Sequence, residues 1–138
     1  MDDITFTEVE IASRSPFVLN DLGPQTPHAA LKAGYYTPAT QEPPFGAVVV
    51  SEGLGGVKTA RERRYGRFLA QHGFAALVID SFDARGHAGS PHPLRALRVS
   101  ESMMLADAFA SLTWLAARPE VDGNRVGHIG FSYGGMIA

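Results

Sequence analysis

The chain has 138 residues, of which 45% are hydrophobic and 19% are charged, and its formal net charge is −2. This composition suits one folded domain with a moderate core and argues against intrinsic disorder. The near balance of acids and bases provides no basic footprint for nucleic acid and no polybasic patch for a membrane surface. The absence of cysteine excludes disulfides, zinc–thiolate sites and a cysteine nucleophile.

No apolar stretch is long enough to span a bilayer, and the acidic start Met1-Asp2-Asp3 lacks the charged-then-apolar pattern of a secretory leader. We therefore expect a cytoplasmic protein with no membrane partner and no nucleic-acid partner. A mature secreted protein whose leader has been removed would have the same composition.

The first third of the chain predicts two strands. Residues 4–11 partly alternate between apolar and polar side chains, which predicts an edge strand. Residues 16–27 are rich in turn-forming Asn, Asp, Gly and Pro and predict a loop. Residues 31–37 alternate again and predict a second strand, which Pro38 ends.

Two short, continuous apolar runs follow, at residues 46–50 and 74–79. Such runs are typical of strands that are buried on both faces of a sheet. The first run leads into a glycine-rich loop over residues 51–57, and the second ends at Asp80.

A helix is expected between these two strands. Thr59 and Glu62 match a capping box, in which both side chains satisfy free amide groups at a helix start. The apolar spacing then predicts a core-facing stripe made of Tyr65, Phe68, Leu69 and His72.

The remaining chain predicts a long loop, a long helix and a third buried strand. Residues 81–98 are rich in Gly, Pro, His and Arg, and a loop of this length in a compact domain is often functional. Residues 99–118 have so wide an apolar surface that we expect a helix with little solvent exposure. Pro119 and a turn at residues 122–124 end this helix, and residues 125–129 predict the strand.

The alternation of strands and helices predicts an α/β fold with a mostly parallel sheet and flanking helices, as one partial domain over residues 1–138. Ligands of such sheets gather at the carboxyl ends of the strands. Those ends carry the loops at residues 51–56 and 80–98, and Ser132. We therefore expect these three segments to converge on one edge of the sheet.

Gly130-Phe131-Ser132-Tyr133-Gly134-Gly135 contains the pattern G-x-S-x-G. This pattern is typical of a nucleophile elbow, a tight strand-to-helix turn that raises a serine hydroxyl above the sheet. The oxygen of an attacked ester carbonyl becomes an oxyanion that needs fixed hydrogen-bond donors. We expect the amide of Tyr133 and the amide of Gly53 or Leu54 to supply them. The alternative is a glycine-rich turn with an incidental serine.

Two charged residues near this edge have open roles. Glu52 follows a buried strand, where it could hold the proton of the nucleophile or orient substrate, or it could be a solvated or helix-capping residue. The guanidinium of Arg85 could bind a substrate carboxylate, or it could pair with Asp80 or Asp83.

The glycine loop also allows a different class of function. Gly53 and Gly55 lie between a strand and a helix, and Asp80 ends the next strand, as in a dinucleotide-binding domain. Lys58 stands where the third glycine of that pattern is expected, and the sequence of a phosphate-binding P-loop does not follow. Nucleotide binding therefore stays as the alternative to ester hydrolysis.

None of the five histidines follows Ser132, where the chain order of serine, acid and histidine would place a catalytic base. His72 falls on the expected core-facing stripe and His128 in a strand, which favours structural roles for both. His87 and His92 lie in the long loop. Either could act as a base, or both could bind a metal with an aspartate of that loop, although their spacing matches no metal motif.

Three segments resemble the dienelactone hydrolase family of the α/β-hydrolase superfamily: residues 48–56, residues 80–86 and the elbow at residues 130–135. The resemblance covers about residues 31–138, which correspond to the N-terminal half of such an enzyme.

The resemblance implies roles for single residues. Ser132 would be the nucleophile of an ester or lactone hydrolase, and the amides of Tyr133 and Gly53 would form its oxyanion hole. Glu52 would contact the resting nucleophile, and Arg85 would lie near the acidic group of the substrate. No metal or organic cofactor is implied.

Two departures from the family pattern change the expected function. The best-known members have cysteine where this chain has Ser132, which favours a serine esterase or a broader carboxylic-ester hydrolase over hydrolysis of dienelactone itself. The family also places its acid and histidine after the nucleophile helix, a region that this sequence lacks. We therefore expect the 138 residues alone to be inactive or nearly so, and to need a complementing C-terminal hydrolase segment or a second chain. A non-catalytic interaction module that retains the elbow is the remaining alternative.

Overall fold

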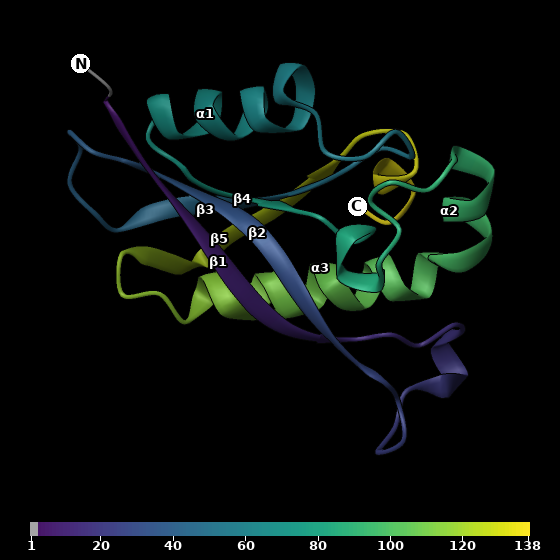
Figure 1. Cartoon of the computed structure of the whole chain (residues 1–138). Coiled ribbons are helices and arrows are strands. Elements are labelled where there is room, and N and C mark those ends of the chain that lie inside the picture. Colours follow the sequence, from purple (N-terminus) through teal and green to yellow (C-terminus); the bar gives the residue numbers. More distant parts are fainter. Residues whose placement is uncertain (1–2) are drawn as a thin grey trace.

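The computed structural model contains a five-stranded sheet with helices on both faces (Figure 1). The strands are β1 (Ile4–Arg14), β2 (His28–Pro38), β3 (Phe45–Ser51), β4 (Ala75–Ile79) and β5 (Val121–Gly130), in the spatial order β1-β2-β4-β3-β5. β4, β3 and β5 are parallel, whereas β1 and β2 are antiparallel to their neighbours. This arrangement confirms the predicted α/β class. The structure describes residues 3–138, so Met1 and Asp2, and the expectation about a leader, lie outside the described residues.

β1 and β2 pair along their whole length, from Ile4 opposite Pro38 to Arg14 opposite His28. β1 lies at the edge of the sheet, as predicted. Both strands are longer than the alternation of side chains indicated, because their backbone pairing continues beyond the residues that alternate. The loop between them, predicted over residues 16–27, contains a 3-10 turn at Leu19–Asp21.

β3 is the centre of the parallel part of the sheet, with β4 on one side and β5 on the other. Every residue of β4 is buried, and so is every residue of β3 except Val48. This burial confirms that the continuous apolar runs form strands covered on both faces. β5 begins at Val121, earlier than predicted, because the turn at residues 122–124 is accommodated by a shift of register against β3.

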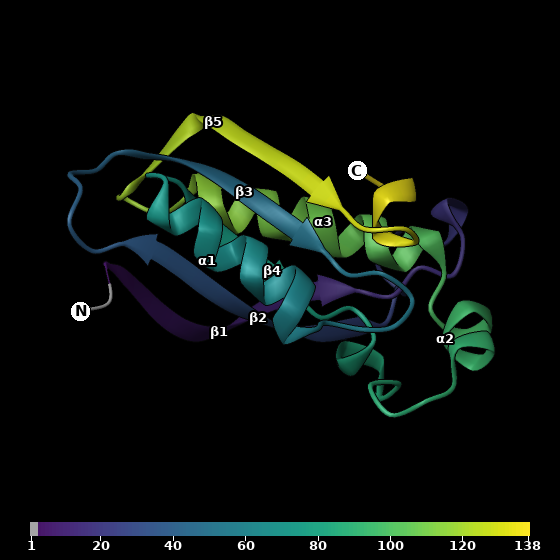
Figure 2. The ribbon, with the colours of Figure 1, turned by 90° about the horizontal axis from the view of Figure 1, so that it is seen from above.

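Two helices cover opposite faces of the sheet, with α1 (Arg64–Gln71) in front and α3 (Glu101–Ala116) behind in the view of Figure 2. α3 begins after Ser100, whose hydroxyl accepts a hydrogen bond from the Met103 amide at 3.2 Å. The predicted low exposure of this helix is only partly correct, since Phe109 is 63% exposed. Over residues 3–138, no helix is long and apolar enough to cross a membrane.

The predicted core-facing stripe of α1 is correct only for Leu69, which is half-buried and packs against the core, and is wrong for Tyr65, Phe68 and His72. Tyr65 and Phe68 are 45% and 51% exposed, and the buried residues of this helix are instead Gly66 and Ala70. A Cβ at Gly66 would lie 2.8 Å from Val78 Cγ2. The helix therefore approaches the sheet so closely that only small side chains fit between them, and a pattern of large apolar residues cannot reveal such a face.

The start of this helix also differs from the predicted capping box. A π-helical turn at Thr59–Arg63 precedes it, with Lys58 at the N-cap and no side-chain cap. Glu62 does accept a hydrogen bond from the amide of the N-cap, but that residue is Lys58, four positions earlier, and not Thr59. Glu62 is buried and also pairs with Arg61 at 2.8 Å. Glu62 therefore satisfies a free amide at the helix start, as predicted, whereas the predicted capping by the Thr59 hydroxyl is wrong.

Residues 81–98 do not form one continuous loop. They contain a 3-10 turn at Asp83–Arg85 and the short helix α2 at His92–Arg98. α2 lies at the same end of the molecule as the last residues of the chain (Figure 1). Residues 81–98 therefore pack beside the elbow at the carboxyl end of the parallel strands.

Candidate active site

Ser132 lies at a sharp turn directly after β5, and it is exposed. Its φ is 51°, in the left-handed region that residues other than glycine rarely adopt. The turn is closely packed, since a Cβ at Gly130 would lie 2.2 Å from Gly134 O and one at Gly134 would lie 2.5 Å from Glu52 O. Side chains are therefore excluded on both sides of the serine, and this is the geometry that a nucleophile elbow requires.

Two segments with unpaired backbone amides meet at this turn. A Cβ at Gly53 would lie 3.3 Å from Phe131 O, so the loop after β3 is adjacent to the elbow. Among residues 3–138, no hydrogen-bond acceptor is found for the amides of Tyr133, Gly53 and Leu54. Amides that lack a partner in the protein can bind an anionic oxygen of a ligand. The amides expected to form an oxyanion hole are thus free to do so.

Glu52 is fully buried, and its two carboxylate oxygens accept hydrogen bonds from the Ser81 amide at 3.2 and 3.0 Å. Its own burial, and then the neighbouring Asp80 carboxylate, raise the pKa of Glu52 well above its ordinary value. The alternative of a solvated glutamate is therefore wrong. Within the described residues no hydrogen bond joins Glu52 to Ser132, so its contact with a resting nucleophile stays a prediction.

Arg85 is engaged inside the protein. Its Nη1 and Nη2 donate to the two carboxylate oxygens of Asp107 at 2.5 and 3.0 Å. Its other donors reach a serine hydroxyl and backbone carbonyls, and its side chain is only 8% exposed. The predicted partners Asp80 and Asp83 are wrong, because Asp107 takes their place. In this arrangement no donor of Arg85 remains for a substrate carboxylate.

No histidine hydrogen-bonds Ser132 in the part of the chain that the structure describes. His128 Nε2 lies 2.7 Å from Ser51 Oγ, and burial lowers the pKa of His128, which fits the structural role predicted for it. His72 is exposed, contrary to its predicted place on a core-facing stripe. Residues 3–138 contain no group of three His, Asp or Glu side chains that could hold a metal ion, so the loop histidines do not assemble the metal site that we considered.

Two buried charged residues that the sequence patterns did not single out organise the surrounding loops. Asp107 is fully buried and accepts hydrogen bonds from Arg85 and from Ser13 Oγ, the latter at 2.5 Å. Arg95 is 7% exposed, and its Nη1 donates to Leu54 O at 2.9 Å. A carboxylate in the middle of an otherwise apolar helix was a usable signal that Asp107 is buried, whereas the irregular sequence around Arg95 provides no such signal.

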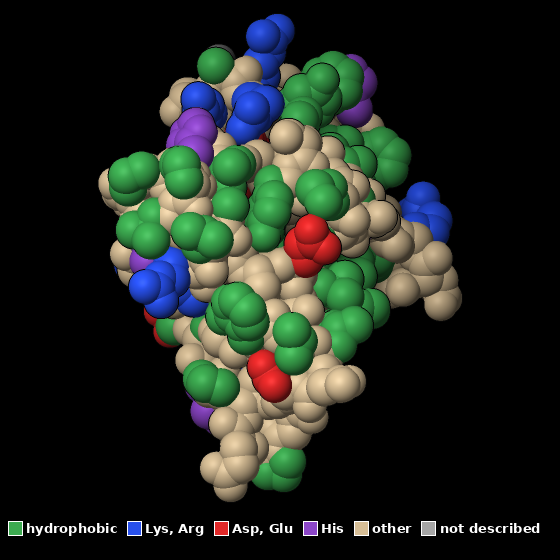
Figure 3. All heavy atoms as spheres, turned by 90° about the vertical axis from the view of Figure 1, so that its right-hand side faces the viewer, with side chains coloured by type: hydrophobic (Ala, Val, Ile, Leu, Met, Phe, Trp, Pro, Cys, Tyr) green, Lys and Arg blue, Asp and Glu red, His purple; other side chains and the backbone are tan. Residues whose placement is uncertain are grey.

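The surface around the carboxyl ends of the parallel strands is rich in hydrophobic side chains. Figure 3 shows this end of the molecule, with few acidic groups among the apolar ones. In α2, Leu94 and Leu97 are 37% and 70% exposed, and Met136 after the elbow is 66% exposed. Ligand sites are commonly apolar with a few fixed polar groups, and this surface has that composition.

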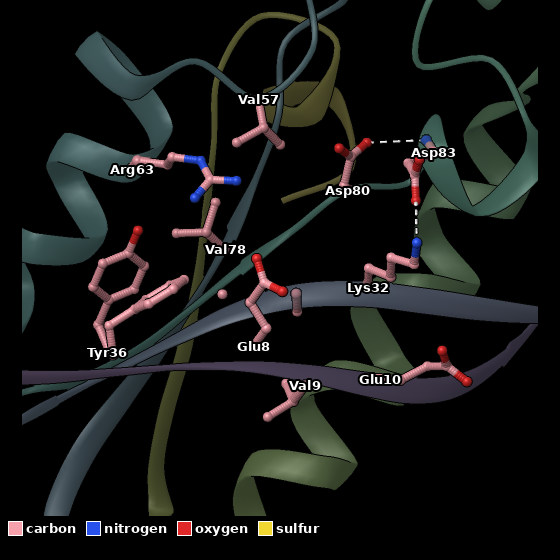
Figure 4. Close-up of a pocket in the computed structure, with 13 residues that line it drawn as sticks. Glu8, Val9, Glu10, Lys32, Tyr36, Val57, Arg63, Val78, Asp80 and Asp83 are labelled. Atoms are coloured by element: carbon pink, nitrogen blue, oxygen red, sulfur yellow. Dashed lines mark hydrogen bonds and ion pairs between the residues drawn. The ribbon is translucent and has the colours of Figure 1, made fainter.

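A separate pocket of about 450 Å³ lies on the α1 side of the sheet (Figure 4). Arg63 and Asp80 line it, and Lys32 forms an ion pair of 3.9 Å with Asp83 at its rim. Ser132 and the unpaired amides are not part of this pocket. The candidate active site is therefore defined by its chemistry and not by the shape of the surface.

A sheet that carries helices on both faces, with a glycine-flanked serine on a left-handed turn after a parallel strand, defines the α/β-hydrolase fold class. The model of the dienelactone hydrolase family matches residues 31–138, and the chain belongs to this family. The family resemblance inferred from the three sequence segments is thereby confirmed.

Solved structures agree with this placement, and the chain is also similar to a curated protein without an assigned function. The structure named m3DLH superposes with a TM-score of 0.76 at 25% sequence identity, over 99% of this chain and 52% of that one. Dienelactone hydrolase from Anabaena variabilis shares the fold, with a TM-score of 0.66 at 22% identity, over 99% of this chain and 56% of that one. An uncharacterised protein of Mycobacterium tuberculosis is 34% identical over 105 residues, which are 76% of this chain and 34% of that protein. The chain thus spans about half the length of the solved relatives and about a third of the curated one.

Proposed function

We propose that the chain carries the nucleophile and the oxyanion hole of a serine hydrolase that acts on carboxylic esters or lactones. The observation that carries this proposal is Ser132 itself, an exposed residue held at φ 51° beside the unpaired amides of Tyr133, Gly53 and Leu54. Membership of the dienelactone hydrolase family supports the same chemistry.

In the proposed reaction, Ser132 Oγ attacks the carbonyl carbon of the ester, and its proton passes to a base. The carbonyl oxygen becomes anionic and accepts hydrogen bonds from the Tyr133 amide and from the amide of Gly53 or Leu54. The carbon–oxygen bond then breaks, the alcohol leaves with the proton from the base, and the acyl group stays on Ser132. Water attacks this acyl-enzyme by the same steps and releases the acid.

The substrate class follows from two features of the chain. A serine nucleophile stands where the best-known family members have cysteine, which favours ordinary carboxylic esters over dienelactone. The family resemblance places Arg85 near an acidic group of the substrate, but the guanidinium of Arg85 already donates to the carboxylate of Asp107. We therefore propose that the preferred substrates are uncharged near the scissile bond.

The reaction needs a base, which residues 3–138 do not place at Ser132. We propose that a complementing hydrolase segment or a second chain brings a histidine and an acid there. β5 supports this proposal, because it pairs only with β3 within the described sheet, and its other edge can accept a further strand. Exposed aromatic residues on the neighbouring helix, such as Phe68, would be covered by such an addition.

A fluorophosphonate probe tests the proposed function, because it reacts only with an activated serine. We expect labelling at Ser132 when the chain is combined with a C-terminal hydrolase segment, and no labelling in the Ser132→Ala variant. Turnover of p-nitrophenyl acetate should follow the same pattern.

The hydrolase proposal is overturned when the complemented protein is unlabelled, and binding of NAD or ATP by that protein would then support the nucleotide-binding alternative. Enzyme-like turnover by the purified 138-residue chain alone would overturn the need for complementation.

A further inference from the structure

α2 is held in place in an unusual way. It has seven residues, and Arg95 is its one buried residue. Its large apolar residues point outward, since Leu94 and Leu97 are 37% and 70% exposed. An isolated helix of this length is not stable in water, and tertiary contacts must hold it. Within the helix these contacts come from the charged side chain of Arg95, and apolar packing enters only at the C-cap, where Val99 is buried against Phe82 and Met104.

The guanidinium of Arg95 binds the backbone of two different loops. Its Nη1 donates to Leu54 O at 2.9 Å, its Nε donates to His87 O at 3.0 Å, and its Nη2 donates to Ala88 O. The central carbon of the guanidinium, Cζ, lies 5.2 Å from the centroid of the Phe82 ring. Among the described residues Arg95 has no carboxylate partner. Backbone carbonyls and an aromatic face therefore compensate for the burial of this cation.

The bond to Leu54 O restricts the loop that carries one expected oxyanion donor. Gly56 N–H donates to Gly53 O at 2.9 Å, which orients the peptide that contains the Leu54 amide. Arg95 binds the Leu54 carbonyl and so orients the next peptide, between Leu54 and Gly55. In a trans peptide the direction of the carbonyl also fixes the direction of the N–H group. A Cβ at Gly56 would lie 3.3 Å from Arg95 Nη1, and glycine there leaves room for the guanidinium. Two consecutive peptides are thus fixed, one by the turn and one by Arg95.

The C-terminal end of α2 binds the segment that carries the other donor. Val99 N–H donates to Arg95 O at 2.9 Å, and Val99 O accepts a hydrogen bond from the Tyr133 hydroxyl at 2.8 Å. The ring of Tyr133 also stacks on Phe82, with centroids 6.3 Å apart. The same short helix therefore contacts the residue after Ser132 and, through Arg95, the loop after β3.

We propose that α2 is a clamp that sets the distance between the two amide donors of the oxyanion hole, and that Arg95 is its main positioning residue. This inference rests on the proposed function, because it assigns α2 a role in the same site. An oxyanion hole lowers the barrier only when its donors are fixed before charge develops. Loss of the guanidinium would free the Leu54 peptide and slow acylation, while substrate binding would change little.

Hydrogen exchange tests the clamp without any need for catalysis. In the 138-residue chain, we expect Arg95→Ala to raise the exchange rate of the Gly56 amide about tenfold or more, with little change in β3. Arg98→Ala is the matched control, because Arg98 lies on the same helix and is exposed. Equal exchange at Gly56 in Arg95→Ala and wild type would overturn the clamp, whether or not Ser132 is a nucleophile.

Kinetics in the complemented enzyme separate positioning from substrate binding. We expect Arg95→Ala to lower kcat about 10- to 100-fold for p-nitrophenyl acetate, with KM nearly unchanged and partial recovery on addition of guanidinium ion. Arg98→Ala should behave as wild type. If Arg95→Ala does not fold, Arg95→Lys is the substitute. Lysine keeps the positive charge but lacks the planar set of guanidinium donors, so this variant should give an intermediate kcat. A raised KM with unchanged kcat, or wild-type kinetics in both Arg95 variants, would contradict the positioning role.

Discussion

The guanidinium of Arg85 and the carboxylate of Asp107 form a two-pronged ion pair that joins the turn after β4 to the middle of α3, at 2.5 and 3.0 Å. Asp107 is fully buried, and it also accepts a hydrogen bond from Ser13 in β1. Arg85 reaches the same strand through Arg14 O at 2.8 Å. One buried pair thus connects the edge strand, the helix below the sheet and a loop at its functional edge.

Removal of one partner should destabilise the chain strongly. Asp107→Leu leaves a buried guanidinium without its counter-charge, which typically costs about 3–5 kcal/mol of unfolding free energy. Urea denaturation measures this loss. The double variant Arg85→Met with Asp107→Leu is the control, because it removes both charges and should recover most of the stability. Equal losses in the single and double variants would show that packing, and not charge pairing, is responsible.

A methyl group on the inner side of the elbow should disrupt it. A Cβ at Gly134 would lie 2.5 Å from Glu52 O and 2.6 Å from Ser51 O, whereas a Cβ at Gly127 meets nothing within 4 Å. We expect Gly134→Ala to lower stability by about 2–3 kcal/mol and to abolish labelling of Ser132. Gly127→Ala, in the strand β5 that leads into the elbow, should change neither. Matching denaturation curves for the two variants would count against the closely packed turn.

The left-handed backbone at Ser132 predicts an unusual effect of glycine. Ser132→Gly and Ser132→Ala both remove the hydroxyl, but glycine adopts a φ of 51° without a Cβ penalty. We expect the glycine variant to be more stable than the alanine variant by about 1 kcal/mol in urea denaturation. Elsewhere in a folded chain, glycine is usually the less stable of the two, so an alanine variant of equal or greater stability would argue against strain at the elbow.

The buried Glu52 predicts a pH dependence of stability. Its pKa is raised in the folded state, first by its burial and then by Asp80, so the folded chain retains a proton that the unfolded chain releases. Stability should therefore fall as pH rises from the ordinary glutamate pKa toward the raised one. Glu52→Gln cannot ionise and should lack this loss, so that its advantage over wild type is small near about pH 4 and larger near about pH 8. A difference that is constant over this range would contradict the burial of a neutral Glu52.

Several elements of the fold could be predicted because a single physical preference dominates each. The runs that became β3 and β4 are continuously apolar and short, which is typical of strands covered on both faces. The stripe on α1 failed, except at Leu69, for the opposite reason. Its buried face is Gly66 and Ala70, where contact with the sheet demands small residues, and the larger aromatic residues lie on the outside.

The candidate site divides in the same way. Ser132 and the glycines around it form a local motif, and their spacing alone indicates the turn. The partner of Arg85 could not be found locally, because Asp107 is separated from it by 22 residues and lies on a helix with an otherwise apolar pattern. Nor could the contact of Arg95 with Leu54, across 41 residues, be anticipated, because its acceptor is a backbone carbonyl that carries no sequence signal.

The sequence by itself determined the buried parallel strands, the elbow and the identity of the residue at its tip, since each depends on neighbours within a few residues. Tertiary structure decided which charges meet, which face of α1 is covered and that two amide-bearing loops share one short helix. Those outcomes depend on distances between segments far apart in the chain, and local preferences of hydrophobicity and backbone conformation do not encode such distances.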